Sequence, residues 1–121
     1  MNLVEKTISP DPNTDKANQL LHKASEDFHQ LLANSTLSDV TLVVGDKELE
    51  AHKNILGARS PVFAAMFEHD FKEKNENRVN IDDVPLNVFE ELLRYIYSGK
   101  VVDMDKYATG LLAASDKVRY L

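Results

Sequence analysis

The 121-residue sequence contains no cysteine, which excludes disulfides, thiolate zinc sites and cysteine nucleophiles together. Its four glycines stand apart, at positions 45, 57, 99 and 110, so the sequence has no glycine-rich phosphate loop. No stretch approaches the roughly eighteen apolar residues of a membrane span, and residues 1–16 lack the apolar run of a signal peptide. We therefore expect an intracellular protein, in the nucleus or the cytoplasm, with no membrane partner.

The sequence also lacks a basic patch. Aspartate and glutamate number 20 against 14 lysines and arginines, giving a formal net charge of −6, and the basic residues are scattered among acids. Such a surface repels phosphate groups on average, so we expect no nucleic-acid partner. Hydrophobic residues make up 43% and charged residues 28%, which is ordinary for a globular protein, and the length predicts one domain with one core.

The first part of the chain divides into two segments. Residues 1–14 carry two prolines and no apolar period, which predicts a flexible tail. Over residues 15–34 apolar side chains recur every three or four positions, which predicts an amphipathic helix. Thr14 or Asp15 is the expected N-cap of this helix, because a short polar side chain can accept a hydrogen bond from the first turn.

The remaining residues, 35–121, alternate short strands with helices. The β-branched run 39–44, a tight turn at Gly45 and the alternating segment 47–52 predict a β-hairpin. A short helix over 53–58 that closes near Gly57 follows, and then a helix from Pro61 to about His69 that Ser60 caps. After a predicted strand over 78–81, a helix runs from Pro85 to Gly99. The last elements are a candidate short strand over 100–102 and a helix from about residue 103. The predicted fold class is therefore α+β.

No active site emerges from the polar residues. His22 and His29 lie two turns apart on the predicted helix, too far apart to bind one metal ion without help. His52 follows a strand, and we interpret it as a structural histidine bonded to backbone or to an acid rather than as a catalytic base. We expect no enzyme activity, no cofactor, no metal site and no small-molecule substrate.

An apolar stripe on the helix over 15–34 has no obvious partner within the sequence. Its members are Leu20, Leu21, Phe28, Leu31 and Leu32. The stripe precedes the compact core, and no antiparallel helix is joined to it by a short loop. Because a solvent-facing stripe of this kind is prone to aggregate, it must dock on the domain's own core or on another chain, and we favour another chain.

Six segments occur in a specific order: SDVTLVV, LEAHKNIL, ARSPVFAAMF, NRVNIDDV, VFEELLRYIYSGKV and LLAASDKV. Together they resemble the BTB/POZ domain over about residues 36–121, and they are most similar to the MATH–BTB cullin-3 adaptors of the speckle-type POZ protein group. The resemblance implies a helical cluster flanked by a short, mostly three-stranded sheet, with an extra N-terminal dimerisation helix over 15–34. It also implies a further helix after Leu121, so the BTB/POZ domain over 35–121 is expected to be short at its C-terminal end.

The same resemblance implies a homodimer. The positions that match the family's dimer interface are Ala24, Phe28, Leu31 and Ile55, with Ala24 standing where a larger residue is usual. Asp39 and Lys53 match an acid–base pair that lines the dimer groove in many BTB domains. The alternative for these two residues is an ion pair that stabilises the fold.

A short motif implies a specific partner. BTB adaptors bind the N-terminal domain of cullin-3 through a hydrophobic residue, any residue and a glutamate after the PVFxxMF helix, and Phe71-Lys72-Glu73 fits this pattern. The alternative is that Phe71 packs against Phe67. The expected function is therefore a substrate adaptor of a cullin-3 ubiquitin ligase, and the alternative is a BTB dimer that recruits transcriptional corepressors.

Overall fold

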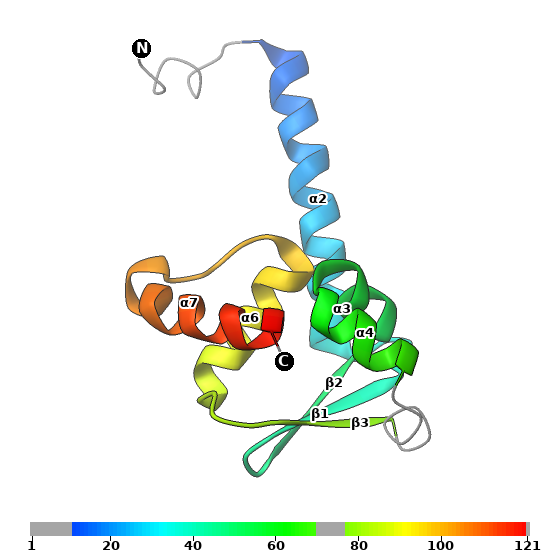
Figure 1. The fold of residues 1–121 in the computed structure, drawn as a ribbon. Coiled ribbons are helices and arrows are strands. Elements are labelled where there is room, and N and C mark those ends of the chain that lie inside the picture. The colour runs from blue at the N-terminus through cyan, green and yellow to red at the C-terminus, as the bar shows by residue number, and fades with distance from the viewer. Residues whose placement is uncertain (1–10, 70–76, 121) are drawn as a thin grey trace.

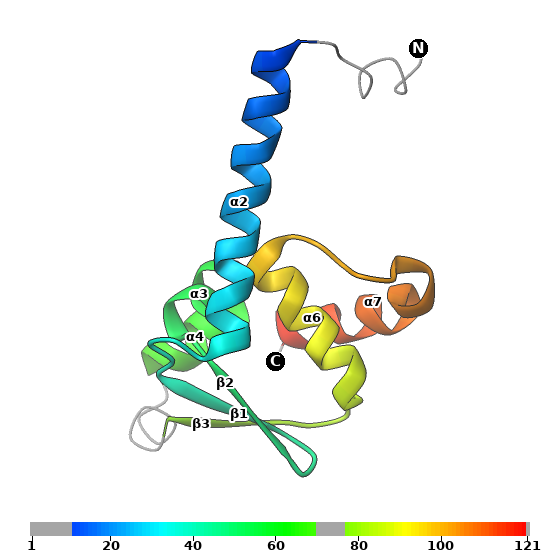
Figure 2. The same ribbon diagram turned by 180° about the vertical axis from the view of Figure 1, so that it is seen from behind.

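The computed structural model describes residues 11–69 and 77–120, and it confirms the α+β class. The described elements are α2 (Pro12–Asn34), β1 (Val40–Val44), β2 (Lys47–Ala51), α3 (Lys53–Arg59), α4 (Pro61–His69), β3 (Arg78–Ile81), α6 (Leu86–Ser98) and α7 (Met104–Tyr120). Figures 1 and 2 show the sheet at the lower end of the molecule with the helices above it, α3 and α4 toward one end of the strands and α6 and α7 toward the other.

The three strands form one sheet in the order β2-β1-β3. β1 pairs antiparallel with β2, and the tight turn between them places Gly45 in the left-handed region with a φ of 61°. β1 also pairs in parallel with β3, where Val44 lies beside Ile81. Burial alternates along β1, so that Val40, Leu42 and Val44 are buried. This alternation is typical of a sheet with one covered face.

One hydrophobic core joins the covered face of the sheet to the helices. Its buried members are Val40, Leu42, Val44, Ala51, Leu56, Phe63, Val79, Ile81, Val84, Phe89, Leu92, Leu93, Ile96, Tyr97 and Ala114. More of these residues come from α6 than from any other described helix. α6 is therefore the central helix of the domain, and α7 and α3 pack against it.

The first helix begins earlier than the sequence predicted, at Pro12 rather than at residue 15. The carboxylate of Asp11 accepts a 2.9 Å hydrogen bond from the backbone N–H of Asn13 and caps the helix. Proline suits the first helical position because its φ is already helical and no N–H is needed there. Part of the predicted tail is therefore helical, and Asp15 lies in the first turn instead of capping it.

Two other predicted boundaries are also wrong. α3 continues through Gly57 to Arg59. A Cβ at residue 57 would make only an ordinary contact, 3.6 Å from the Cα of Ala64 in α4, so Gly57 neither ends the helix nor is required by the packing of α4. Residues 100–102 form no strand; they belong to the segment that joins α6 to α7.

α2 differs from the other described helices because none of its residues is buried, whereas each of the others has at least one buried residue. Figures 1 and 2 show its N-terminal half extending away from the rest of the described chain, while its C-terminal half lies beside α6. Leu20 and Leu21, in the N-terminal half, are 72% and 71% exposed. Leu31 and Leu32, near the other end, are partly buried against the core. The predicted apolar stripe is therefore only half covered by its own domain.

Candidate protein-interaction surface

The outer part of the contact between α2 and α6 is polar. The hydroxyl of Ser25 donates a 2.7 Å hydrogen bond to the backbone oxygen of Ser98, the last residue of α6. One turn earlier on α2, the Nδ1 of His22 lies 2.7 Å from the Nζ of Lys100. Both contacts link the exposed part of α2 to the C-terminal end of α6 and the segment that follows it.

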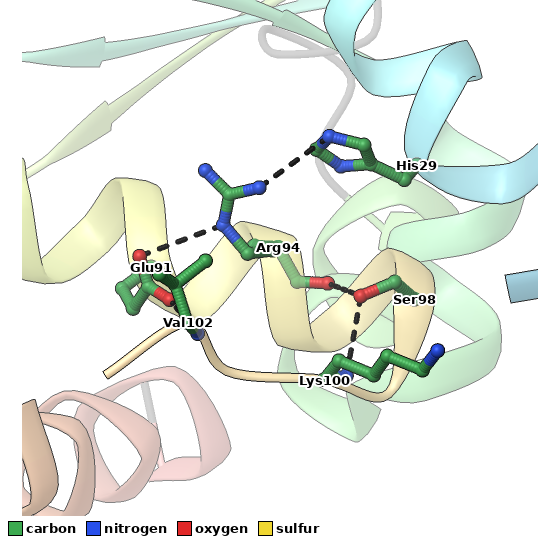
Figure 3. A network of polar contacts seen from close by, with 6 residues as sticks. All are labelled: His29, Glu91, Arg94, Ser98, Lys100 and Val102. Atoms are coloured by element: carbon green, nitrogen blue, oxygen red, sulfur yellow. Dashed lines mark hydrogen bonds and ion pairs between the residues drawn. The ribbon is translucent and has the colours of Figure 1, made fainter. Parts of the chain in front are cut away.

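His29 continues this row of polar side chains toward the core. Its Nε2 lies 3.4 Å from the Nη1 of Arg94, as Figure 3 shows. The Nε of Arg94 lies 3.5 Å from a carboxylate oxygen of Glu91, which is only 6% exposed. A buried carboxylate is costly unless it is paired and hydrogen-bonded, and Glu91 has partners on both of its oxygens.

The second oxygen of Glu91 fixes the segment after α6. It accepts a 2.7 Å hydrogen bond from the backbone N–H of Val102. Nearer to α6, the hydroxyl of Ser98 donates to the backbone oxygen of Arg94 at 2.7 Å and accepts from the backbone N–H of Lys100 at 3.1 Å (Figure 3). The N–H groups of Lys100 and Val102 are thus bonded to side-chain oxygens, in the segment for which the sequence suggested a strand. Side chains rather than a neighbouring strand therefore hold this segment.

A shallow, mainly apolar groove of about 430 Å³ lies between α2, α3 and the end of α6. The lining residues are Phe28, Asn54, Ile55, Ala58, Arg59, Ile96, Tyr97, Ser98 and Gly99. Phe28 is 46% exposed at one edge, and Ile55 is half-buried on the opposite helix. The structure therefore brings together two of the four residues that the resemblance assigns to a dimer interface.

The other two interface candidates lie elsewhere on α2. Leu31 is partly buried and packs against the core of its own domain. Ala24 is exposed, one turn before Phe28 and outside the lining of the groove. A charged residue at position 31 would consequently disturb the fold itself. A charged residue at position 28 would change the open groove, so it is the better test of an interface there.

Arg59 is a groove residue that the sequence reasoning did not single out. Its Nε donates a 3.1 Å hydrogen bond to the backbone oxygen of Ile96, and its guanidinium lies 5.4 Å from the ring centre of Tyr95. Gly99, which was predicted to end α6, does so in the left-handed region with a φ of 76°. No local signal marked Arg59, because the helix over 53–58 was expected to end before it, whereas α3 continues to Arg59.

Asp39 and Lys53 meet, but not as the expected pair of charged groups. The carboxylate of Asp39 accepts a 2.8 Å hydrogen bond from the backbone N–H of Lys53, the first residue of α3. The Lys53 ammonium instead donates to the Oδ1 of Asn77 at 2.7 Å and lies 5.9 Å from the ring centre of Phe67. Asp39 therefore caps α3 within one copy, and the ion pair between the two side chains is not formed.

His52 has the structural role that the sequence suggested. Its backbone N–H donates to the hydroxyl of Tyr97 at 2.9 Å, and its Nδ1 lies 2.8 Å from the same hydroxyl. Its Nε2 contacts the backbone oxygen of Thr36, which requires the proton on Nε2 and leaves Nδ1 to accept from Tyr97. Burial raises the pKa of Tyr97 to about 12, so the hydroxyl stays neutral and can bridge the two atoms of His52.

The cullin-binding candidates Phe71 and Glu73 lie outside the described residues. The helix that precedes them, α4, is well anchored: Ser60 caps it through a 3.3 Å hydrogen bond from the Phe63 N–H, and Phe63 stacks on Phe67 with ring centres 5.8 Å apart. The alternative contact between Phe71 and Phe67 therefore stays a prediction.

The residues that the structure describes hold neither a cluster suited to a metal ion nor a helix able to span a membrane. Within residues 11–69 and 77–120, no group of three histidine, aspartate or glutamate side chains could hold a metal ion. Over the same residues, no helix combines the length and the apolar character needed to cross a bilayer. Two features that involve α2 have a clear chemical character: the apolar groove beside Phe28 and the polar row formed by His22, Ser25 and His29.

Comparison with known proteins agrees with this architecture. The BTB/POZ domain family matches residues 28–120, and the fold is similar to the BTB domain of zebrafish PATZ1 with a TM-score of 0.63. The two sequences are 22% identical, and the similarity covers 87% of this chain and 81% of that chain. BTB domains are protein–protein interaction modules that typically dimerise, and they are generally not enzymes. Since the family match spans most of the sequence, this chain belongs to the BTB/POZ domain family.

Proposed function

We propose that this chain is the homodimeric BTB module of a substrate adaptor for a cullin-3 ubiquitin ligase. The observation that carries the dimer is the open groove in which Phe28 of α2 faces Ile55 of α3. An aromatic side chain that is 46% exposed beside an apolar groove is the kind of anchor that protein interfaces bury. A second copy of the chain supplies the same groove and the same anchor, as a two-fold interface requires.

The cullin-3 assignment rests on the motif Phe71-Lys72-Glu73 and on its position in the chain. The motif follows α4, whose last described aromatic side chain, Phe67, stacks on the fully buried Phe63. The helix that precedes the motif is thus anchored to the core as far as Phe67, and this supports the use of the residues that follow it in partner recognition. In this role the chain carries no catalytic residue, and the ubiquitin transfer chemistry belongs to the assembled ligase.

The dimer is tested by charging the groove. Phe28→Glu would bury unpaired carboxylates in a two-fold interface, a cost of several kcal/mol that is enough to dissociate a dimer. The matched control is Gln19→Glu, which adds the same charge to α2 at an exposed polar side chain outside the groove and outside the apolar stripe. By light scattering at roughly 50 µM protein, we expect dimers for the wild type and Gln19→Glu and monomers for Phe28→Glu. A monomeric wild type would contradict the proposal.

Cullin binding is tested by calorimetric titration with the cullin-3 N-terminal domain. Phe71→Ala removes the expected aromatic anchor and should weaken binding by about 2 kcal/mol or roughly thirtyfold, mainly through faster dissociation. Glu73→Gln should mainly slow association, because a charge at the rim steers the encounter more than it adds affinity. Thermal melting separates the alternative, since a Phe71 that packs on Phe67 would lower the melting temperature when removed.

The corepressor alternative is decided by the same experiment. A folded wild-type dimer that does not bind the cullin-3 domain would contradict the adaptor role. It would favour the recruitment of transcriptional corepressors in the dimer groove.

A further inference from the structure

The polar row on α2 contains two contacts between a histidine and a cation. His22 meets Lys100 at 2.7 Å, and His29 meets Arg94 at 3.4 Å. The two histidines lie seven residues apart, so both point from the same side of α2 toward α6 and the segment after it. Ser25, between them in the sequence, makes the third contact of the row.

These contacts require neutral imidazole rings. An ammonium or guanidinium group can only donate hydrogen bonds, so each ring nitrogen that faces a cation must accept. In His29 the accepting atom is Nε2, which leaves the proton on Nδ1, and that buried Nδ1 has no hydrogen-bond partner within the described residues. A second proton on His29 would therefore point at the guanidinium of Arg94 and turn an attraction into a repulsion.

Little else holds the outer part of α2. None of its residues is buried, and its contacts with the core come from Leu31 and Leu32 at the C-terminal end. The groove residue Phe28 lies directly beside His29 in the sequence. A change in the polar row therefore alters the position of the side chain that forms one edge of the groove.

We propose that the polar row holds α2 against α6 in a pH-dependent way, and that protonation of His22 and His29 loosens α2 from α6. Histidine is the side chain whose charge ordinarily changes between about pH 5 and pH 8, so this is the range over which the contacts are to be tested. The loosening is a property of a single copy. Its consequence for assembly rests on the proposed dimer, because Phe28 would then leave its place opposite Ile55 and the dimer would weaken in acid.

Other titratable groups face the same region and could oppose this effect. Those that line the cavities beside His29 are Glu26 of α2, Glu48 and Glu50 of β2, Glu90 and Glu91 of α6, Lys100 after α6 and Tyr107 of α7. Glu48 is paired with Arg78 at 2.7 Å, and Glu91 is bound to Arg94 and to the Val102 N–H. Glu26 lies between the two histidines in the sequence, so it is the acid that could stabilise their charged forms.

Hydrogen exchange of the α2 backbone, corrected for the intrinsic effect of pH, measures docking directly. Between about pH 7.5 and pH 5.5 we expect the protection of wild-type residues 22–33 to fall by roughly tenfold or more. In the double variant His22→Gln/His29→Gln, which keeps an acceptor but cannot take a proton, the change should be less than about twofold. The variant Lys100→Met removes one facing cation and should give an intermediate loss.

The outcomes separate this proposal from the proposed dimer. Equal loss of protection in the wild type and the double variant, no loss in either, or a gain in acid through Glu26 would overturn the pH-dependent contact of α2. Light scattering on the same samples reports the dimer independently. If the wild type is monomeric at the higher pH but loses α2 protection in acid, the pH-dependent contact of α2 is supported and the proposed dimer is contradicted.

Discussion

α2 and α6 are neighbouring amphipathic helices, but they are attached to the domain in opposite ways. α6 buries five apolar side chains, Phe89, Leu92, Leu93, Ile96 and Tyr97, whereas no residue of α2 is buried. A fully buried large side chain contributes about 1.5–3 kcal/mol, while an exposed polar contact contributes about 0–1 kcal/mol. The stability of the fold therefore resides around α6, and α2 is the helix whose position a partner or a change of conditions can alter most easily.

The largest test of this comparison is a pair of phenylalanine truncations. Phe89 of α6 is fully buried, so Phe89→Ala should lower the free energy of unfolding by about 3–5 kcal/mol. Phe28 of α2 is 46% exposed, and Phe28→Ala should cost less than about 1 kcal/mol in a single copy. Urea unfolding at low protein concentration measures both changes.

Two outcomes for these variants would contradict the difference between α2 and α6. If Phe28→Ala proves as costly as Phe89→Ala, and the cost grows with protein concentration, Phe28 is buried by a second chain in solution. A large cost that does not depend on concentration would mean that α2 is attached to its own domain more firmly than its exposure indicates.

The two helices also differ in where their polar contacts lie. Tyr97 of α6 makes its contacts with His52 in a buried site, whereas His22 and Lys100 meet at an exposed one. Burial raises the pKa of Tyr97 from 10.0 to about 12, and the negative charge of Asp39 adds to the rise while the His52 N–H opposes it. A buried hydroxyl of this kind should make its own contribution to the pH dependence of folding.

The sign of that contribution follows from the direction of the shift. Because the pKa is higher in the folded state, the stability from the neutral hydroxyl is complete below about pH 10 and is lost as the pH rises through about 12. The loss should reach about 2–3 kcal/mol, and Tyr97→Phe, which cannot ionise, should remove it. Urea unfolding at a series of alkaline pH values, with wild type and variant side by side, checks this. Parallel pH profiles for the two proteins would show that other groups dominate.

The sequence predicted α6 well and α2 only in part, for physical reasons. The apolar period from Val88 to Ile96 and the stop at Gly99 depend on local residues, and both are observed. The start of α2 was missed because Pro12 was read as a sign of the tail, although proline is favourable in the first turn of a helix. The apolar stripe of α2 was expected to dock on another chain, but Leu31 and Leu32 pack on the chain's own core while Leu20 and Leu21 are exposed. An apolar period reveals a face of a helix but not how much of that face its own domain buries.

The candidate site was less predictable because its contacts join residues far apart in the chain. Nothing local to His29 indicates that it meets Arg94, and the pairing of Ser25 with Ser98 depends on how α2 crosses α6. The family pattern found Phe28 and Ile55 but missed Arg59, whose role depends on the backbone oxygen of Ile96. Only the folded chain could correct the expected pairing of Asp39 with Lys53.

The smallest expected effect tests that correction. If Asp39 caps α3 through the Lys53 N–H, Asp39→Ala should lower the free energy of unfolding by about 1 kcal/mol, and Asp39→Asn should lower it far less because asparagine keeps the acceptor. Lys53→Met, which keeps the backbone N–H and removes the ammonium, should lose only the contacts with Asn77 and Phe67. Under the charge-pair interpretation, Asp39→Asn and Lys53→Met would each cost as much as Asp39→Ala, and all three costs would shrink at high salt. Urea unfolding of the three variants at low and high salt therefore distinguishes a helix cap from an ion pair, since a hydrogen bond to the first N–H of α3 persists when charges are screened.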